Sequence, residues 1–586
     1  MHQLAGTMHQ IWYNCGMKIR AATTVLLLVM MAAAGMPQAA WAAIPLDGRV
    51  YDAYLKTAPG KERKAFLREA FGGGQFDMRD IFELVEATKE DEWDVKRAAK
   101  LDKLIRSGLG RAGGATTDCG RRIVAIRERV VEPIKKKHNL IVDGVHGYST
   151  EGYVEPKSPA VREALERFRD RKLGLMIHFG IYSQLGIHES WPLVDKEAGW
   201  SRRLVDWQTD GEAFKREYWS MAESFNPVRL QPDVWAETAR RDGFKYLIFT
   251  TKHHDGFCLF DSKYSDFKVT MPSCPFSKNP KADIVKHVFD AFRAKGLTIS
   301  CYFSKPDWHH PDYWDNRGLG QTVDRMPTYD VEEHPERWAR YREFVRNQLL
   351  ELTRDYGPLD QLWLDGGQVQ KHQGLDIRIE EIIEEARKIQ PGLIAVDRAT
   401  GTASENIVTP EQTVPPVPLM VPWESCITMG TGFSYRYDDT FKSERELIHL
   451  LIDIVAKGGN LALNVAPGPD GRFPAPAVAR MDAMGEWLAK NGKAIYGTRV
   501  LKPYRTGDWS FTAGKKGERY AIRLWQERER GTRTLKLPEA FAGNVTAAVR
   551  VSSGRASPVA IRNGVPTFEL AADDRADAYA DAFELK

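Results

Sequence analysis

Residues 283–304 read DIVKHVFDAFRAKGLTISCYFS, a helix pattern followed at once by a strand pattern. Between Asp283 and Lys295 the apolar residues recur three and four positions apart, which is the spacing of an amphipathic helix. Gly296 is a residue type that ends helices, and the apolar run Thr298–Phe303 has the length of a buried strand. The stretch therefore predicts a helix that packs on a sheet and leads into a strand of that sheet.

The same alternation extends over residues 160–495. Amphipathic segments separate the short apolar runs, and Ser443 with Glu446 forms a capping-box signature at the start of one of them. Such alternation is typical of a parallel sheet with right-handed crossovers, and six or more units favour an α/β fold of the (β/α)8, TIM-type barrel class over a doubly wound open sheet. The other runs are Leu173–Ile177, Tyr246–Thr250, Gln361–Leu364, Leu393–Val396 and Asn460–Val465.

Two flanking regions differ from this pattern. Residues 43–155 are charge-rich with helical periodicity and carry no motif, so we expect a helical N-terminal region. Residues 498–586 contain short alternating runs separated by turn residues, which predicts a C-terminal antiparallel β-sandwich. The expected catalytic barrel domain then spans residues 156–497.

The first 42 residues have the features of a targeting segment. Lys18 and Arg20 precede a charge-free apolar stretch that ends in the small-x-small sequence 40–42. This pattern predicts a Gram-negative-type signal peptide at 1–42, with an over-called start before Met17, and hence a secreted or periplasmic protein. A membrane anchor is the alternative. The small residues favour cleavage, after which we expect no stable membrane insertion.

Composition excludes some classes of partner. The chain has 586 residues with 83 basic and 79 acidic side chains, so its net charge of +4 gives no basis for nucleic-acid binding. Six scattered cysteines without CxxC spacing argue against a disulfide framework or a thiolate zinc site. The 16 tryptophans slightly favour carbohydrate as a ligand, because indole rings stack on sugar faces.

Polar side chains follow the apolar runs at the positions where a barrel builds its active site. Asp365 ends one run, and a buried carboxylate is costly without partners. Taken alone it could equally be a cap on the following Gly-Gly turn. Residues after neighbouring runs could hydrogen-bond a sugar and keep Asp365 ionised; they are His178, His253, His254 and Arg398.

A metal site is an alternative use of these side chains. His178, His253, His254 and Asp365 are all acceptable zinc ligands by type. However, adjacent strand residues point to opposite faces, so the histidine pair could chelate one ion only if the strand kinks there. The sequence also lacks HxH and HExxH motifs. We therefore expect no metal and no other cofactor.

Several of these segments resemble glycoside hydrolase family 29, the α-L-fucosidases, in order over about residues 160–500. The segments are Leu173–Ser183, Asp233–Tyr246, Thr251–Asp266, Trp363–Gly366, Trp423–Cys426, Lys457–Asn464 and Glu486–Thr498. The resemblance implies a retaining exo-α-L-fucosidase that acts on fucosylated glycans, with Asp365 as the nucleophile. It also implies substrate-binding roles for His178, Glu189, Trp191, His253, His254, Tyr302, Trp363, Arg398 and Trp423.

The sequence departs from the family pattern between Glu189 and Trp191, and it does not by itself identify the general acid/base. Ser190 separates Glu189 from Trp191, where the family has an adjacent Glu-Trp pair. Retaining chemistry needs a second carboxyl group about 5–5.5 Å from the nucleophile. The resemblance places it in the loop 401–422 or just beyond.

The candidates for this general acid/base are Glu405, Glu411 and Glu424. Glu411, 13 positions after Arg398, best matches the family position. Burial near Val414 and Trp423 would raise its pKa towards neutrality, as proton donation requires. A non-catalytic sugar-binding protein and a glycosidase for another sugar, such as an α-L-galactoside, are the remaining alternatives. The presence of both carboxylates argues against the first.

Overall fold

The computed structural model describes residues 150, 153–194, 198, 201, 211–315, 325–398, 403–529, 533–571 and 573–586. The chain divides into two compact units, residues 1–142 and 143–586, and all described residues belong to the second. The predicted signal peptide and nearly all of the predicted helical region lie outside the described residues, so both stay predictions. Among the described helices, none combines the length and the apolar character needed to cross a membrane.

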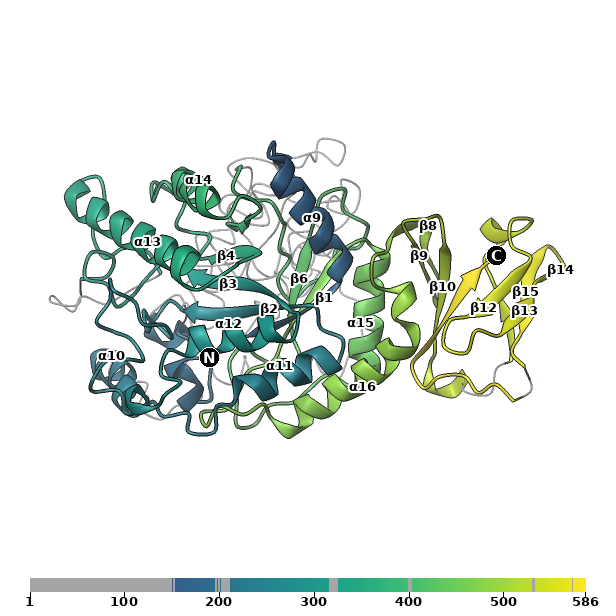
Figure 1. Ribbon diagram of the computed structural model, residues 1–586, viewed down its shortest axis with the longest axis horizontal. Helices are drawn as coiled ribbons and strands as arrows, with labels where there is room; N and C mark the ends of the chain where they lie inside the picture. The colour runs from purple at the N-terminus through teal and green to yellow at the C-terminus, as the bar shows by residue number, and fades with distance from the viewer. Residues whose placement is uncertain are drawn as a thin grey trace, which may run out of the picture. The chain divides into compact units, whose positions relative to one another are not determined.

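A curled parallel sheet of seven strands forms the centre of this unit, in the order β5-β4-β3-β2-β1-β7-β6 (Figure 1). Its strands are almost completely buried, which explains why the apolar runs identified them. The single missed strand, β6, is Glu-Ser-Cys-Ile-Thr and lacks an apolar run. The bounds are β1 Leu173–Ile177, β2 Tyr246–Lys252, β3 Thr298–Ser304, β4 Gln361–Asp365, β5 Ile394–Val396, β6 Glu424–Thr428 and β7 Asn460–Asn464.

An irregular segment, residues 406–412, occupies the eighth position between β5 and β6. Asn406 donates its backbone N–H to the Ala395 carbonyl of β5 at 2.9 Å. Further along, the Gln412 N–H donates to Cys426 of β6 at 3.0 Å. Pro410 lies between them and has no N–H to donate, so a regular ladder cannot form there. Seven strands and this segment together complete the ring, which confirms the predicted TIM-type barrel.

Helices cover the outside of the sheet (Figure 1). In α12 the predicted apolar stripe is buried, Asp283 caps the first turn by accepting the Lys286 N–H, and the chain leaves the helix at Gly296 with φ +77°. The capping box of Ser443 and Glu446 opens α15 as predicted. The bounds are α9 Pro159–Arg171, α10 Gly211–Ser220, α11 Pro232–Arg241, α12 Ile284–Ala294, α13 Pro335–Asp355, α14 Ile379–Ile389, α15 Glu444–Ala456 and α16 Ala475–Asn491.

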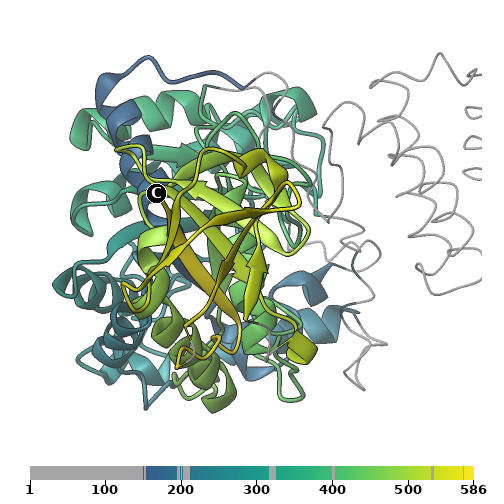
Figure 2. The same ribbon diagram turned by 90° about the vertical axis from the view of Figure 1, so that its right-hand side faces the viewer.

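The C-terminal region is a β-sandwich, as predicted, and faces the viewer in Figure 2. A six-stranded antiparallel sheet, β13-β12-β16-β10-β9-β8, packs with a three-stranded sheet, β11-β15-β14, around a core that includes Trp509, Phe511 and Phe583. The bounds are β8 Arg499–Thr506, β9 Trp509–Ala513, β10 Arg519–Leu524, β11 Thr534–Lys536, β12 Ala547–Arg550, β13 Ala556–Pro558, β14 Ala560–Arg562, β15 Val565–Glu569 and β16 Ala580–Leu585.

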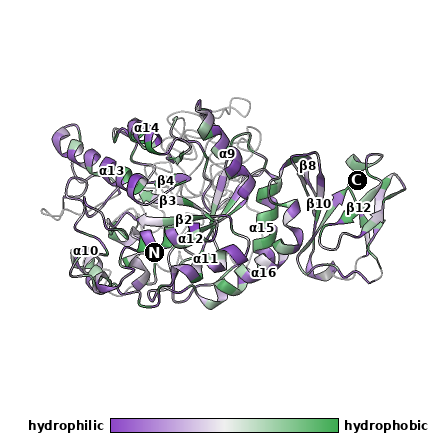
Figure 3. Ribbon diagram, viewed as in Figure 1, coloured by the Kyte–Doolittle hydropathy of each residue, from purple (hydrophilic) through white to green (hydrophobic). Residues whose placement is uncertain are grey.

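The barrel and the sandwich share a packed interface. Helix α15 is hydrophobic over much of its surface (Figure 3), because it lies between the barrel strand β7 and the sandwich strands β8 and β9. Trp487 of α16 donates its indole N–H to the Ala580 carbonyl of β16 at 2.8 Å. This contact and the burial of α15 fix the sandwich against the side of the barrel.

Candidate active site

The carboxyl ends of the barrel strands bring together a group of buried polar side chains. His178 directly follows β1, and His253 and His254 directly follow β2. The His178 ring lies 5.2 Å from the Tyr302 ring of β3, and the two adjacent histidine rings are 4.4 Å apart. Asp365 is the last residue of β4. The structure thus gathers these predicted site residues at one end of the barrel.

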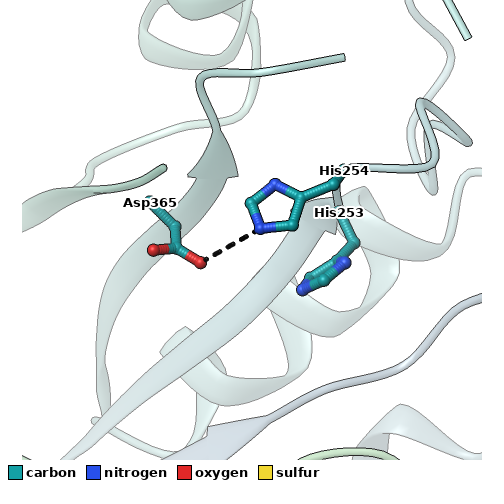
Figure 4. Close-up of side chains that lie close together, drawn as sticks. All are labelled: His253, His254 and Asp365. Atoms are coloured by element: carbon teal, nitrogen blue, oxygen red, sulfur yellow. Dashed lines mark ion pairs between the residues drawn. The ribbon is translucent and has the colours of Figure 1, made fainter. Parts of the chain in front are cut away.

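Asp365 is surrounded by donors from three neighbouring positions. Its Oδ2 accepts the Tyr302 hydroxyl at 2.5 Å and lies 3.7 Å from His254 Nε2. Figure 4 shows the His254 ring pointing at this carboxylate, with His253 beside it. The Arg398 guanidinium lies 3.4 Å from Oδ1. A nearby cation and a hydroxyl donor both favour the ionised form of a carboxylate.

The turn after Asp365 depends on Gly366. This residue has φ +92°, and a Cβ on it would lie 2.2 Å from Cδ of Pro306. Any side chain there would therefore be strained and would collide with the β3 connection. Gly366 therefore allows the chain to turn immediately after Asp365, and this turn fixes the position of the Asp365 carboxylate.

Arg398 bridges two carboxylates. One guanidinium nitrogen lies 3.4 Å from Asp365 Oδ1, and another donates to Glu411 Oε2 at 2.6 Å. Burial lowers the pKa of Arg398, but the charges of Glu411 and Asp365 outweigh this effect and raise it above its usual range. Its backbone has φ +54°, a conformation that costs about 1 kcal/mol or more in a non-glycine residue and is typical of functional sites.

The three candidate glutamates occupy different places. Glu411 belongs to the irregular eighth segment and is bonded to the guanidinium that also contacts Asp365. Glu405 accepts the Asp397 backbone N–H at 3.1 Å. Glu424 begins β6, which places it at the amino end of the barrel. The structure therefore brings Glu411 to the site and leaves Glu424 below it.

The Glu424 carboxyl group is fully buried and is bonded to two neutral side chains. Its carboxyl group accepts the Trp363 indole N–H at 3.1 Å and is hydrogen-bonded to the Tyr246 hydroxyl. Burial raises the pKa of Glu424 to about 7, with both hydrogen bonds opposing this shift. In the part of the chain that the structure describes, both hydrogen-bond partners of the Glu424 carboxyl group are neutral side chains.

The two other predicted sugar-binding tryptophans differ in position: Trp363 borders the cluster, with the Arg398 guanidinium 5.1 Å from its ring centroid, whereas Trp423 lies away from it. Trp423 precedes β6 and packs on Gly459, whose added Cβ would lie 2.4 Å from the indole ring. A five-residue strand spans about 13 Å, so the structure leaves Trp423 at the wrong end of the barrel for sugar contact. Trp363 is fully buried and stacks under Tyr302 with ring centroids 5.3 Å apart. It supports Tyr302 from beneath.

Glu189 and Trp191 reach the site from the connection after β1. Glu189 is buried, and its Oε1 accepts the Ser434 backbone N–H at 2.6 Å. Burial raises the pKa of Glu189 to about 7, and the charge of Glu411 adds to the shift. The Trp191 ring lies 5.6 Å from the His254 ring. Although Ser190 separates Glu189 from Trp191 in the sequence, both side chains therefore lie at the site.

His178 and His253 are uncharged near neutral pH. Burial lowers the pKa of His178 to about 4 and lowers the pKa of His253 well below its usual value. Asn464, the last residue of β7, donates its amide to the Phe433 carbonyl, so its oxygen faces His178 Nδ1 at 2.8 Å. His178 therefore carries its proton on Nδ1, and Nε2 can accept a hydrogen bond from a hydroxyl.

Asn464 was not among the predicted site residues, although it ends a barrel strand, which is where active-site residues of a barrel are expected. Ser190 was also missed, since the sequence shows it as an interruption of a motif. Its hydroxyl lies 2.5 Å from His253 Nδ1. No periodicity or spacing predicts such a contact between two connecting segments.

His253, His254 and Asp365 could together hold a metal ion by residue type. One ligand atom from each lies within 4.8 Å of the others (Figure 4). Two histidines and a carboxylate are a known zinc-ligand set. However, the Arg398 guanidinium is fixed beside Asp365 and repels a second cation. The arrangement suits a sugar ring better than a divalent ion.

Comparison with known proteins gives a consistent result. Residues 146–493 match the family model described as Alpha-L-fucosidase. The plasma alpha-L-fucosidase of Rattus norvegicus is 27% identical over 348 residues, covering 57% of this chain and 71% of the relative.

Solved structures agree. Alpha-L-fucosidase isoenzyme 1 from Paenibacillus thiaminolyticus superposes with a TM-score of 0.61 at 27% identity, covering 73% of this chain and 99% of that one. The Thermotoga maritima alpha-fucosidase in complex with fucose gives 0.58 at 25% identity, covering 74% and 100%.

Proposed function

The chain belongs to the alpha-L-fucosidase family, and from this premise we propose that it hydrolyses terminal α-L-fucose from fucosylated glycans with retention of configuration. The observation that carries the proposal is the bridge formed by Arg398, which contacts Asp365 on β4 and Glu411 on the eighth segment. Retaining hydrolysis needs two carboxyl groups on either side of the scissile bond.

Asp365 is the nucleophile in this proposal. It attacks the anomeric carbon, the C–O bond to the leaving group breaks, and a glycosyl ester forms. The Tyr302 hydroxyl and Arg398 hold the carboxylate in place before attack. His178 and His253, both neutral, are suited to binding sugar hydroxyls, and Trp191 supplies an aromatic face beside His254.

Glu411 is the general acid/base. It gives a proton to the leaving oxygen in the first step and removes one from water in the second. Arg398 couples the two steps. While Asp365 is ionised, it shares the guanidinium with Glu411; once Asp365 is esterified, Arg398 interacts with Glu411 alone.

Hydrolysis of an aryl α-L-fucoside, followed by proton NMR, tests the proposal. The first-formed product is expected to be α-L-fucose, which later mutarotates. Initial release of β-L-fucose would contradict retention, and release of galactose but not fucose from matched aryl glycosides would contradict the sugar assignment. Full activity after dialysis against a chelator is expected; loss restored by zinc would instead support a metal-dependent hydrolase.

We also propose that the protein is secreted or periplasmic, with residues 1–42 acting as a cleaved signal peptide. The support is the charged segment, apolar stretch and small-x-small end in the sequence. Protein recovered from the periplasm of a Gram-negative host should begin near residue 43 by N-terminal sequencing. A membrane-bound product that retains the apolar stretch would contradict cleavage.

A further inference from the structure

Lys305, the first residue after β3, is a buried cation beside the site. Its side chain is fully buried, and its backbone N–H donates to the carbonyl of Asp365 at 2.9 Å. The Tyr341 hydroxyl of α13 donates to the Lys305 carbonyl at 2.5 Å. The main chain of Lys305 is therefore held on both sides, and one of its partners is the proposed nucleophile.

The ammonium group of Lys305 reaches the end of β5. It donates to Oδ1 of Asp397 at 2.7 Å and to the backbone carbonyl of the same residue, also at 2.7 Å. Asp397 directly follows β5 and precedes Arg398, so this carbonyl belongs to the peptide group that joins Asp397 to Arg398. Because a peptide group is planar, a hydrogen bond to its oxygen also restrains its N–H. Lys305 thus restrains the peptide plane on the amino side of Arg398.

Arg398 requires such restraint, because its φ of +54° is unfavourable for a residue with a side chain. A residue in a sparsely populated backbone conformation stays there only when its surroundings determine it. On the carboxyl side, the Arg398 carbonyl oxygen lies against Gly367, where an added Cβ would be 2.9 Å from that oxygen. Lys305 and Gly367 therefore act on the two peptide groups that flank Arg398.

We infer that Lys305, paired with Asp397, is a positioning residue that holds the Arg398 backbone in this conformation and so keeps its guanidinium between Asp365 and Glu411. This inference rests on the proposed function. The guanidinium lies 3.4 Å from Asp365 and 2.6 Å from Glu411. Relaxation of φ to the negative values that most residues adopt would swing the Cα–Cβ bond of Arg398 and break this bridge.

Lys305→Met removes the ammonium group and keeps the backbone N–H that donates to Asp365. Initial-rate kinetics on an aryl α-L-fucoside should show kcat reduced about 10- to 100-fold, because a small misplacement of the reacting groups lowers the rate strongly. An unchanged kcat would overturn the inference.

Arg550→Met is the matched control for the loss of a buried cation. Arg550 lies in the sandwich and donates to the buried carboxylate of Asp581 at 2.6 Å. Like Lys305→Met, this variant leaves a buried aspartate without its cation and should lower the melting temperature. At a temperature where both variants are folded, Arg550→Met should keep the wild-type kcat. Equal losses of kcat in the two variants would mean a structural role only and would overturn the inference.

A double-mutant cycle tests whether Lys305 acts through Arg398. If it does, removal of Lys305 matters only while Arg398 is present, so Lys305→Met should change kcat less than about threefold in the Arg398→Ala background. A loss in that background as large as the loss in wild type would show independent effects and contradict the inference.

Lys305→Met combined with Asp397→Leu keeps the inference testable if the single variant fails to fold, because an apolar pair leaves no unpaired buried charge. This double variant should lose kcat as the single variant does, and a wild-type kcat would overturn the inference.

Nitrogen-15 NMR of arginine-labelled protein reports on Arg398 without any substrate, with its signals assigned by their loss in Arg398→Ala. Wild type should show slowly exchanging Nη protons on a guanidinium whose rotation is hindered, and Lys305→Met should lose them. Identical Arg398 signals in the two proteins would overturn the inference. Failure of the proposed function is distinguishable, because wild type would then be inactive on α-L-fucosides while the Arg398 signals would still differ between the two proteins.

Discussion

The barrel contains two buried carboxylate groupings at its opposite ends, and they differ in what balances their charge. At the carboxyl ends of the strands, Arg398 lies between Asp365 and Glu411. At the amino end, Glu424 is bonded to the neutral donors Tyr246 and Trp363, and its pKa is raised to about 7. A nearby cation favours the ionised form of a buried carboxyl group, which can then react. A buried carboxyl group that has only neutral partners instead serves to hold the surrounding side chains together.

Replacing Asp365 with alanine should have the largest effect. We expect kcat/KM on an aryl α-L-fucoside to fall about 10⁴-fold or more, as is typical when a nucleophile is removed. Initial-rate kinetics measure the loss, and an unchanged melting temperature would show that the fold is retained. Activity equal to wild type would refute the role of Asp365 and favour a non-catalytic protein or another site.

Glu411→Ala should reduce activity about 10²- to 10⁴-fold on a fucoside with a poor leaving group, because proton donation is lost. A dinitrophenyl fucoside, which needs no proton, should be much less affected in the first step, and added azide should yield an α-fucosyl azide. The matched control is Glu405→Gln, whose carboxylate is bonded to the Asp397 N–H. If Glu405→Gln showed these signatures instead, the acid/base assignment would move to Glu405.

A pair of tyrosine variants compares the two ends directly. Tyr302→Phe removes the hydroxyl bonded to Asp365 and keeps the ring stacked on Trp363. Loss of a hydrogen bond to a charged group costs about 1.5–3 kcal/mol, so kcat should fall roughly 10- to 100-fold. Tyr246→Phe removes the hydroxyl bonded to Glu424 and should change kcat less than about threefold. A larger kcat effect from Tyr246→Phe would reverse the comparison.

The smallest effect on activity is expected from Glu424→Gln, which should alter stability instead. In wild type the pKa is raised from 4.5 to about 7, so the folded state binds an extra proton between these values. This stabilisation is fully present below pH 4.5 and is lost as pH rises through about 7, an effect on the order of 3 kcal/mol.

Urea unfolding across this range measures the difference between wild type and Glu424→Gln. The variant should lose this part of the pH dependence of stability. The part that comes from Glu189, whose pKa is also raised to about 7, should remain in both proteins. Identical pH profiles for the two proteins would show that folding does not raise the pKa of Glu424.

The sequence predicted the parts of the site that follow regular strands. Periodicity located Asp365 at the end of β4 and the histidines after β1 and β2, because a buried strand leaves an unbroken apolar run that ends where the polar residues begin. Trp423 and Glu424 were predicted to lie at or near the site because their motif was recognised, but the strand β6 that begins there was not predicted. Once β6 is seen to start at Glu424, both belong to the opposite end of the barrel.

By itself, the sequence determined the barrel class, the sandwich, the family and most of the strand-end residues, since these depend on local periodicity and short motifs. Tertiary structure decided which glutamate meets Arg398, because residues 406–412 reach the eighth position through hydrogen bonds to two strands distant in sequence. It also decided the contact of Ser190 with His253. Contacts between separate segments depend on how the chain closes in space, and spacing along the chain does not encode them.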